Sequence, residues 1–348
     1  MRELILAHYQ TYPNLQIQDI FKFIYQSAFG CEHLVSSLET VTDYIRKEYA
    51  CVGVERSPAI EPLDGAYCRV PLSYLKNGLS AETLGKIFFL SAKKEENGQQ
   101  ALLEKLEIAK ELVAENLLPF SKEDFEQSLA DWKAKGYPAI HHSNIFRETY
   151  KPAYRVIAKE YIPFLPFLAD LDKRLANGSV KVAIEGGSAS GKTTLSNLLA
   201  SIYDCTVFHM DDFFLQPHQR TPQRYAEVGG NIDRERFLTE VLQPLSKGDV
   251  INYRRFDCST MQLEDAIQIT PKKIVVIEGA YSMHPDLATY YDFSVFLDIS
   301  PEKQKERILK RNSSPLAKRF FEEWIPLEKT YFSTFHMKEQ CSMQISIT

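Results

Sequence analysis

The sequence lacks several features that would assign the protein to a particular class. It contains no run of about 18 apolar residues, so we expect no transmembrane helix and no membrane partner. Its first ten residues hold an acidic residue and only a short apolar stretch, which is not the layout of a signal peptide. Six cysteines are present but none forms a C-x-x-C pair, so no zinc or redox motif is indicated. We expect free thiols in a reducing cytoplasm.

Basic residues are not in excess either. The chain carries 41 Lys and Arg against 46 Asp and Glu, a formal net charge of −5. Dedicated nucleic-acid binders usually show a basic surplus, so we expect no nucleic-acid partner. With 348 residues, 44% of them hydrophobic, the chain is typical of a globular protein. At about 100–200 residues per domain, two domains are expected.

The two halves differ in their hydrophobic pattern. Over residues 1–175 apolar side chains recur at helical spacing, which predicts a mostly α-helical domain whose role the sequence does not reveal. Over residues 176–348 short apolar runs alternate with helix-like segments; the clearest runs are Val180–Ile184, Ile274–Ile277 and Phe293–Ile299. That alternation predicts an α/β domain with three layers, α/β/α, around a parallel sheet.

A phosphate-binding loop follows the first of these runs. The pattern G-x-x-x-x-G-K-[ST] is matched in full, and Thr194 continues it; the matching residues are Gly186, Gly187, Ser188, Ala189, Ser190, Gly191, Lys192 and Thr193. Glycines let the backbone curl so that its N–H groups point at phosphate oxygens. The following helix adds its positive end. Lys192 is expected to reach the β- and γ-phosphates of ATP, and the Thr193 hydroxyl to bind Mg²⁺.

Carboxylates follow two other apolar runs. Asp211 and Asp212 come after Val207–Met210, and Glu278 follows Ile274–Ile277. Ligands of open α/β sheets bind beyond the carboxyl ends of the strands, so these side chains are well placed for a site. A kinase needs a group that accepts the proton of the acceptor hydroxyl and an acidic group near Mg²⁺. Asp211 or Asp212 is the candidate for the first role and Glu278 for the second; turn capping and a plain surface glutamate are the alternatives.

These motifs together resemble a known family. GGSASGKT, DDFF, NIDRERF and VVIEGAYS occur in this order, as in the uridine kinase / phosphoribulokinase / pantothenate kinase family of P-loop kinases, over about residues 179–348. The DDFF segment resembles nicotinamide riboside kinases in particular. The resemblance implies a P-loop NTPase fold, ATP- and Mg²⁺-dependent phosphorylation of a small-molecule hydroxyl, and Asp211 as the catalytic base. The acceptor remains open: a nucleoside, a riboside or another small metabolite.

The resemblance also implies an acceptor pocket and a lid. The segment from Ile251 to Asp257 resembles the Tyr-Asp stretch of uridine kinases, but two arginines intervene; the candidate acceptor residues are Asp212, Phe213, Tyr253, Arg254 and Arg255. The arginines would bind an anionic acceptor or form a solvated surface. Arg307 and Arg311 lie one turn apart on the basic segment 301–312, where the family has its lid helix, and either is a candidate for binding the phosphates.

The N-terminal half carries one polar and aromatic cluster. It comprises residues 137–144 together with Arg147, Tyr150, Tyr154 and Arg155, and would bind an anionic or ring-bearing ligand or pack against the second domain. The segment Cys31-Glu32-His33 has too few metal ligands at suitable spacing and is expected to belong to the core.

The sequence therefore predicts a small-molecule kinase. Two alternatives stay open: an ATP-binding regulatory switch without an acceptor, and a nucleic-acid-modifying kinase, against which the acidic net charge counts. Oligomeric state, a homo-oligomer included, and the choice between the lid cations are not decided by the sequence.

Overall fold

A computed structural model describes residues 1–32, 37–52, 59–93 and 97–347. The chain divides into two compact units, Met1–Leu165 and Pro166–Thr348. Within the described ranges, no helix combines the length and the apolar character needed to cross a membrane. The six cysteines are free thiols.

The first unit is mainly helical, as its hydrophobic spacing predicts. Its helices are α1 (Arg2–Thr11), α2 (Ile17–Phe29), α3 (Leu38–Ala50), α4 (Ala81–Ser91), α5 (Gly98–Ala114), α6 (Lys122–Ala134) and α7 (Asn144–Tyr150). A small antiparallel sheet, β1 (Glu61–Pro62), β2 (Tyr67–Pro71) and β3 (Tyr154–Ala158), joins them in the order β1-β2-β3. Helical spacing gave no indication of this sheet, because every residue of β2 is buried and none of the alternation of a half-exposed strand appears.

Charged side chains are buried inside this unit. Arg69, on β2, is only 2% exposed, and its Nη1 donates to Glu61 Oε2 at 2.9 Å. His8 Nδ1 lies 2.5 Å from the other oxygen of the same carboxylate. Burial pushes the pKa of Glu61 upward, but Arg69 and His8 outweigh it and hold the pKa at about 2. Glu61 is therefore the counter-charge that makes the buried guanidinium tolerable.

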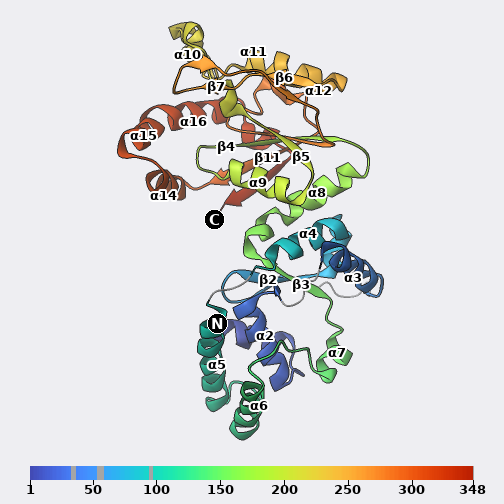
Figure 1. Ribbon diagram of the computed structural model, residues 1–348. Helices are drawn as coiled ribbons and strands as arrows, with labels where there is room; N and C mark the ends of the chain where they lie inside the picture. The colour runs from blue at the N-terminus through green and yellow to red at the C-terminus, as the bar shows by residue number, and fades with distance from the viewer. Residues whose placement is uncertain (33–36, 53–58, 94–96, 348) are drawn as a thin grey trace. The chain divides into compact units, whose positions relative to one another are not determined.

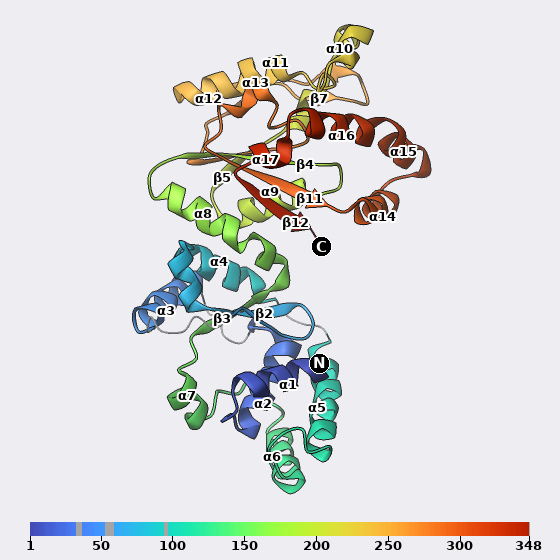
Figure 2. The same cartoon turned by 180° about the vertical axis from the view of Figure 1, so that it is seen from behind.

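The second unit is an α/β layer structure. Five parallel strands lie in the order β12-β11-β4-β10-β5; they are β4 (Val180–Gly186), β5 (Cys205–His209), β10 (Ile274–Glu278), β11 (Phe293–Ile299) and β12 (Met343–Ile347). Helices α8 (Leu165–Leu175) and α9 (Lys192–Ile202) cover one face. On the other face lie α12 (Gln243–Lys247), α13 (Pro285–Ala288), α16 (Ile325–Thr334) and α17 (Met337–Gln340), as Figure 1 and Figure 2 show. The predicted three-layer α/β fold is confirmed.

Shorter elements surround this sheet. They are the 3₁₀ turn η4 (Met210–Phe213), helices α10 (Pro222–Ala226), α11 (Arg234–Phe237), α14 (Pro301–Arg311) and α15 (Ser314–Arg319), and two hairpin pairs, β6 (Ile251–Tyr253) with β9 (Ile267–Ile269) and β7 (Phe256–Asp257) with β8 (Gln262–Leu263). The inner strands β4, β10 and β11 are buried almost throughout because helices cover both faces, which explains why they appear in the sequence as continuous apolar runs.

Glu61→Gln is expected to destabilise the protein by about 3–5 kcal/mol at neutral pH, because it leaves the buried Arg69 charge without its partner. The folded-state pKa of Glu61 lies below the ordinary value of 4.5, so its contribution is complete above that pH and disappears as the pH falls toward about 2. Denaturation of wild type and variant across this range is the measurement. The difference in unfolding free energy should shrink on acidification, and the exposed Glu3→Gln should show neither effect.

Candidate active site

The phosphate loop lies between β4 and α9, at the carboxyl edge of the sheet. Gly186 and Gly191 have φ angles of 148° and 104°, which only glycine adopts easily. A Cβ on Gly186 would meet the Leu297 carbonyl oxygen at 2.7 Å, so neither the conformation nor the space allows another residue there. Ala189, with a φ of 59°, also takes the left-handed conformation. The loop thus has the tight curl that the sequence pattern predicts.

Side chains of the loop point toward the neighbouring strand ends. Lys192 Nζ donates to the carbonyl oxygens of Gly186 and Gly187 at 2.8 and 3.0 Å, so its ammonium group lies across the loop. Thr193 Oγ1 donates to Glu278 Oε1 at 3.0 Å. Glu278 ends β10, which is the immediate neighbour of β4. The sequence-predicted pair of Thr193 and Glu278 is therefore in direct contact.

His209 completes this group, and the sequence analysis missed it. It is the last residue of β5 and stands opposite Glu278 in the strand register. Its Nδ1 lies 2.6 Å from Glu278 Oε1, and this contact raises the pKa of His209. Burial pushes the pKa of Glu278 up, but the bond to His209 and the charge of Lys192 lower it overall. The histidine directly before the Met-Asp-Asp segment was the available clue.

Asp211 lies in the same electrostatic neighbourhood. Its side chain is exposed to solvent, yet enough protein surrounds the carboxylate that partial desolvation raises its pKa. The charge of Glu278 adds to that rise, whereas the charges of Lys192, His209 and Arg311 oppose it. The carboxylate thus lies among the charges of Lys192, His209 and Glu278 while remaining open to solvent.

Buried carboxylates hold the start of the phosphate loop. Glu185, fully buried, accepts hydrogen bonds from the Gly186 and Met283 amides at 2.9 and 3.0 Å and from the Tyr331 hydroxyl at 3.1 Å. Burial raises the pKa of Glu185 to about 7, although these amides and the charge of Lys192 oppose the rise. Glu328, one turn from Tyr331 on α16, accepts from the amide and the hydroxyl of Ser188. Helix α16 is thereby joined to the end of β4 through Tyr331 and to the loop through Glu328.

Side chains of helix α14 bind the carbonyl groups of the same loop. Gln304 Nε2 donates to Ser188 O at 2.8 Å, and Arg307 Nη1 donates to Ala189 O at 3.1 Å. Arg311 makes no such contact, but its positive charge opposes the rise in the pKa of Asp211. The two lid candidates therefore differ. Arg307 is hydrogen-bonded to the loop backbone, and Arg311 interacts electrostatically with the carboxylate of Asp211.

The five candidate acceptor residues divide into two groups. Phe213 and Tyr253 are 0% and 2% exposed and stack in the hydrophobic core with ring centroids 5.7 Å apart. Asp212 and Arg255 are more open, and Arg255 Nε lies 3.4 Å from Asp212 Oδ2. Arg254 is exposed. The three charged residues, and not the two rings, can touch an acceptor directly in this arrangement.

The polar cluster of the N-terminal half separates in a similar way. His142 and Tyr154 are hydrogen-bonded at 2.7 Å, whereas Arg147 bonds to Asn144 and the Tyr150 hydroxyl accepts from the Asn14 amide. His33, part of the disfavoured metal motif, lies outside the described residues. Among the described residues, no group of three or more His, Cys, Asp or Glu side chains has a metal-binding arrangement.

Part of the chain is similar to known proteins. Residues 181–315 match the model of the phosphoribulokinase / uridine kinase family. Uridine kinase-like protein 5 of Arabidopsis thaliana is 27% identical over 143 residues, 38% of this chain and 30% of that protein. The uridine kinase of Chlamydia pneumoniae is 24% identical over 139 residues, covering 37% and 61%. The phosphoribulokinase of Synechocystis is 27% identical over 128 residues, covering 35% and 39%.

The chain thus spans less than two thirds of the length of each of these relatives. Among solved structures, a possible uridine kinase from Bacillus stearothermophilus aligns over 51% of this chain and 95% of its own, with 19% identity and a TM-score of 0.40. The predicted family resemblance of the C-terminal half is confirmed, and the N-terminal half lies outside the family match.

Tyr331→Phe tests the attachment of α16 to the end of β4. Removing the hydroxyl takes a donor from the buried Glu185 carboxylate, which should lower stability by about 1–3 kcal/mol. Denaturation of the full chain measures it. Tyr225→Phe is the matched control, because Tyr225 is 46% exposed and should lose nothing measurable. Equal stability of both variants would show that the Tyr331–Glu185 bond contributes little.

Proposed function

We propose that the C-terminal unit is a kinase that transfers the γ-phosphoryl group of ATP to a hydroxyl of a small molecule. The observation that carries the proposal is the convergence of Lys192, Asp211 and Glu278 at one edge of the sheet: all three charges act on one another there. The family match of residues 181–315 supports the same reaction class. Uridine, named in several relatives, is one candidate acceptor among nucleosides, ribosides and other small metabolites.

The residues present fit a magnesium ion. Thr193 and Glu278 offer a hydroxyl and a carboxylate oxygen 3.0 Å apart, and Mg²⁺ prefers hard oxygen ligands, with few from protein and the rest from water and phosphates. Thr193 would bind the ion, and Glu278 would bind it directly or through water. When bound, the ion would neutralise charge developing on the phosphate oxygens.

Phosphoryl transfer then needs little more than positioning and charge. Amide groups of the loop and Lys192 hold the β- and γ-phosphates. Asp211 accepts the proton of the acceptor hydroxyl, the acceptor oxygen forms a bond to the γ-phosphorus, and the bond from that phosphorus to the bridging oxygen breaks to release ADP. A raised pKa makes the Asp211 carboxylate a stronger base than an ordinary aspartate.

A regulatory switch is the second candidate. Its one favouring observation is the attachment of the phosphate loop to α14 and α16, through which nucleotide binding would move these helices. An acceptor-dependent release of ADP separates the two, because a switch has no acceptor. A panel of nucleosides, ribosides, pantothenate and sugars assayed for ADP release with ATP and Mg²⁺ is the experiment.

Lys192→Ala should abolish turnover, because it removes the cation that holds the transferring phosphate. Asp211→Asn should reduce kcat by about 10²–10⁴-fold with little change in ATP affinity, as expected for a general base. Steady-state kinetics and calorimetric ATP titration measure the two effects. Near-wild-type turnover of Asp211→Asn would reject Asp211 as the base while leaving phosphoryl transfer intact.

The two lid arginines should respond differently. Arg311→Ala should lower kcat, because its charge acts in the field of Asp211 and the transferring group. Arg307→Ala should mainly weaken ATP binding, because Arg307 holds the loop carbonyls at 3.1 and 3.4 Å. Lys310→Ala, on an exposed position between them, is the control. A fall in kcat for Arg307→Ala alone would reverse the assignment.

A further inference from the structure

A cavity of about 230 Å³ opens within the first unit, among α2, α3, α4 and β3. These elements come from distant parts of the sequence and lie together in both views (Figure 1, Figure 2). Val41, Phe88 and Val156 form its apolar wall. Pockets for drug-sized ligands begin at about 300 Å³, so this cavity would suit a smaller molecule.

Gln26 supplies hydrogen-bond donors at the cavity. Its Oε1 accepts from Arg69 Nε at 2.8 Å, which fixes the orientation of the amide. The Nε2 group is therefore turned away from Arg69, and it has no partner among the described residues. Gln26 is 2% exposed and lines the cavity. Nε2 is reached by solvent at the cavity, so its two N–H donors can meet a ligand or water there.

Arg155 and Glu48 bring opposite charges to the same cavity. Arg155 Nη2 lies 2.8 Å from Glu48 Oε2, and Nη1 donates to the Tyr154 carbonyl at 2.9 Å. A guanidinium group has five N–H donors, so Arg155 keeps donors beyond these two contacts. The Arg155 side chain is 11% exposed and that of Glu48 is 39% exposed, so the carboxylate can turn at small cost.

The floor of the cavity is held rigidly from behind. The Tyr154 hydroxyl lies 2.7 Å from His142 Nε2, and His142 Nδ1 lies 2.9 Å from Asp19 Oδ1. Asp19 also accepts two hydrogen bonds from Ser143 and one from the Gln16 amide. Polar groups fixed in this way lose little further entropy when a ligand binds.

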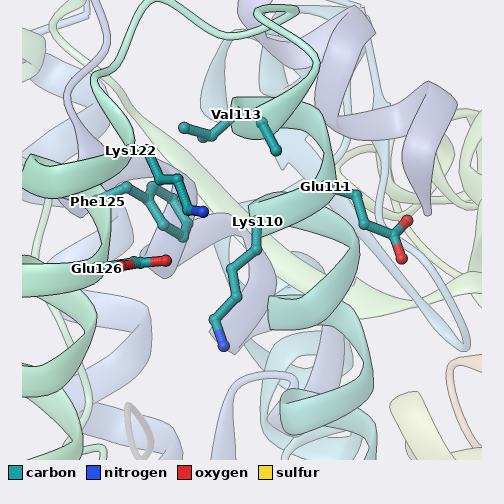
Figure 3. A pocket seen from close by; sticks show the side chains of 7 residues that line it. Lys110, Glu111, Val113, Lys122, Phe125 and Glu126 are labelled. Atoms are coloured by element: carbon teal, nitrogen blue, oxygen red, sulfur yellow. The ribbon is translucent and has the colours of Figure 1, made fainter.

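A second cavity of the same volume, between α5 and α6, lacks these features (Figure 3). The side chains of Lys110 and Glu111, both on α5, point in different directions. Val113 and Phe125 are its buried wall residues, and no buried amide or guanidinium group lines it. Volume alone therefore does not distinguish the first cavity; its polar groups do.

We propose that the cavity lined by Gln26, Glu48 and Arg155 binds a small zwitterion, an α-amino acid with an apolar side chain. The carboxylate accepts from Gln26 Nε2 and Arg155, the ammonium group pairs with Glu48, and the side chain packs against Val41, Phe88 and Val156. A zwitterion keeps both members of the Arg155–Glu48 pair neutralised, whereas a simple anion would leave Glu48 without a partner. The proposal is independent of the proposed phosphoryl transfer.

Calorimetric titration of the full chain tests the proposal with two matched sets of probes. Leucine is compared with isocaproate, which lacks the amine, and isoamylamine, which lacks the carboxylate; phenylalanine is compared with hydrocinnamate and phenethylamine. At least one amino acid should bind with one site per chain. Each analogue of that amino acid should bind about tenfold more weakly, as expected for the loss of one charged hydrogen bond.

Two variants assign the charges. Glu48→Gln should weaken the amino acid about tenfold and leave the amine-free acid unchanged, whereas Arg155→Gln should weaken the acid and leave the amine unchanged. Glu126→Gln, at the second cavity, is the matched control and should change nothing. Circular dichroism verifies that each variant is folded. If Arg155→Gln does not fold, the binding measurements on Glu48→Gln alone test the proposal. Absence of binding by both amino acids, equal binding of the analogues, or equal weakening of all probes by Glu48→Gln would overturn the proposal.

Discussion

The register of three parallel strands is the constraint on which the candidate site depends. Ile184 on β4, Glu278 on β10 and His209 on β5 stand side by side in the register. The loop that follows β4 therefore lies beside Glu278, the last residue of β10, and His209, the last residue of β5. A shift of one residue in either pairing would turn Glu278 or His209 to the opposite face of the sheet. The hydrogen bonds of Glu278 to Thr193 and His209 are the direct result of this alignment.

The phosphate loop is held by the protein as well as shaped for phosphate. The carboxylates of Glu185 and Glu328 accept hydrogen bonds from its amide groups, while Gln304 and Arg307 donate to its carbonyl groups. A loop whose peptide groups are fixed before a ligand arrives has less to reorganise on binding. The same contacts explain why the two arginines one turn apart on α14 are not equivalent. Arg307 is hydrogen-bonded to the loop backbone, whereas the charge of Arg311 acts on the carboxylate of Asp211.

Local patterns predicted the strands, the phosphate loop and the carboxylates at the strand ends, because each lies within a short stretch with its own chemistry. The partners of these residues could not be predicted in the same way. His209 and Glu278 are separated by 69 residues, and Ser188 and Glu328 by 140, and no local pattern links such positions. Phe213 and Tyr253 were grouped with the acceptor residues by motif resemblance, whereas their mutual stacking in the core follows from the meeting of η4 and β6.

The first unit shows how two kinds of buried polar group can be told apart. Asp19 is saturated: four hydrogen bonds reach its two oxygens and, despite burial, lower its pKa. This carboxylate ties α2 to His142 and Ser143, which directly precede α7. Its burial is explained by these hydrogen bonds without a ligand. Gln26 and Arg155 differ because each retains donors after its protein contacts are counted, and both line one cavity. Both side chains also have structural contacts, because Gln26 accepts from the buried Arg69 and Arg155 pairs with Glu48. The donors that remain after these contacts lie at the cavity, where a ligand or water can accept them.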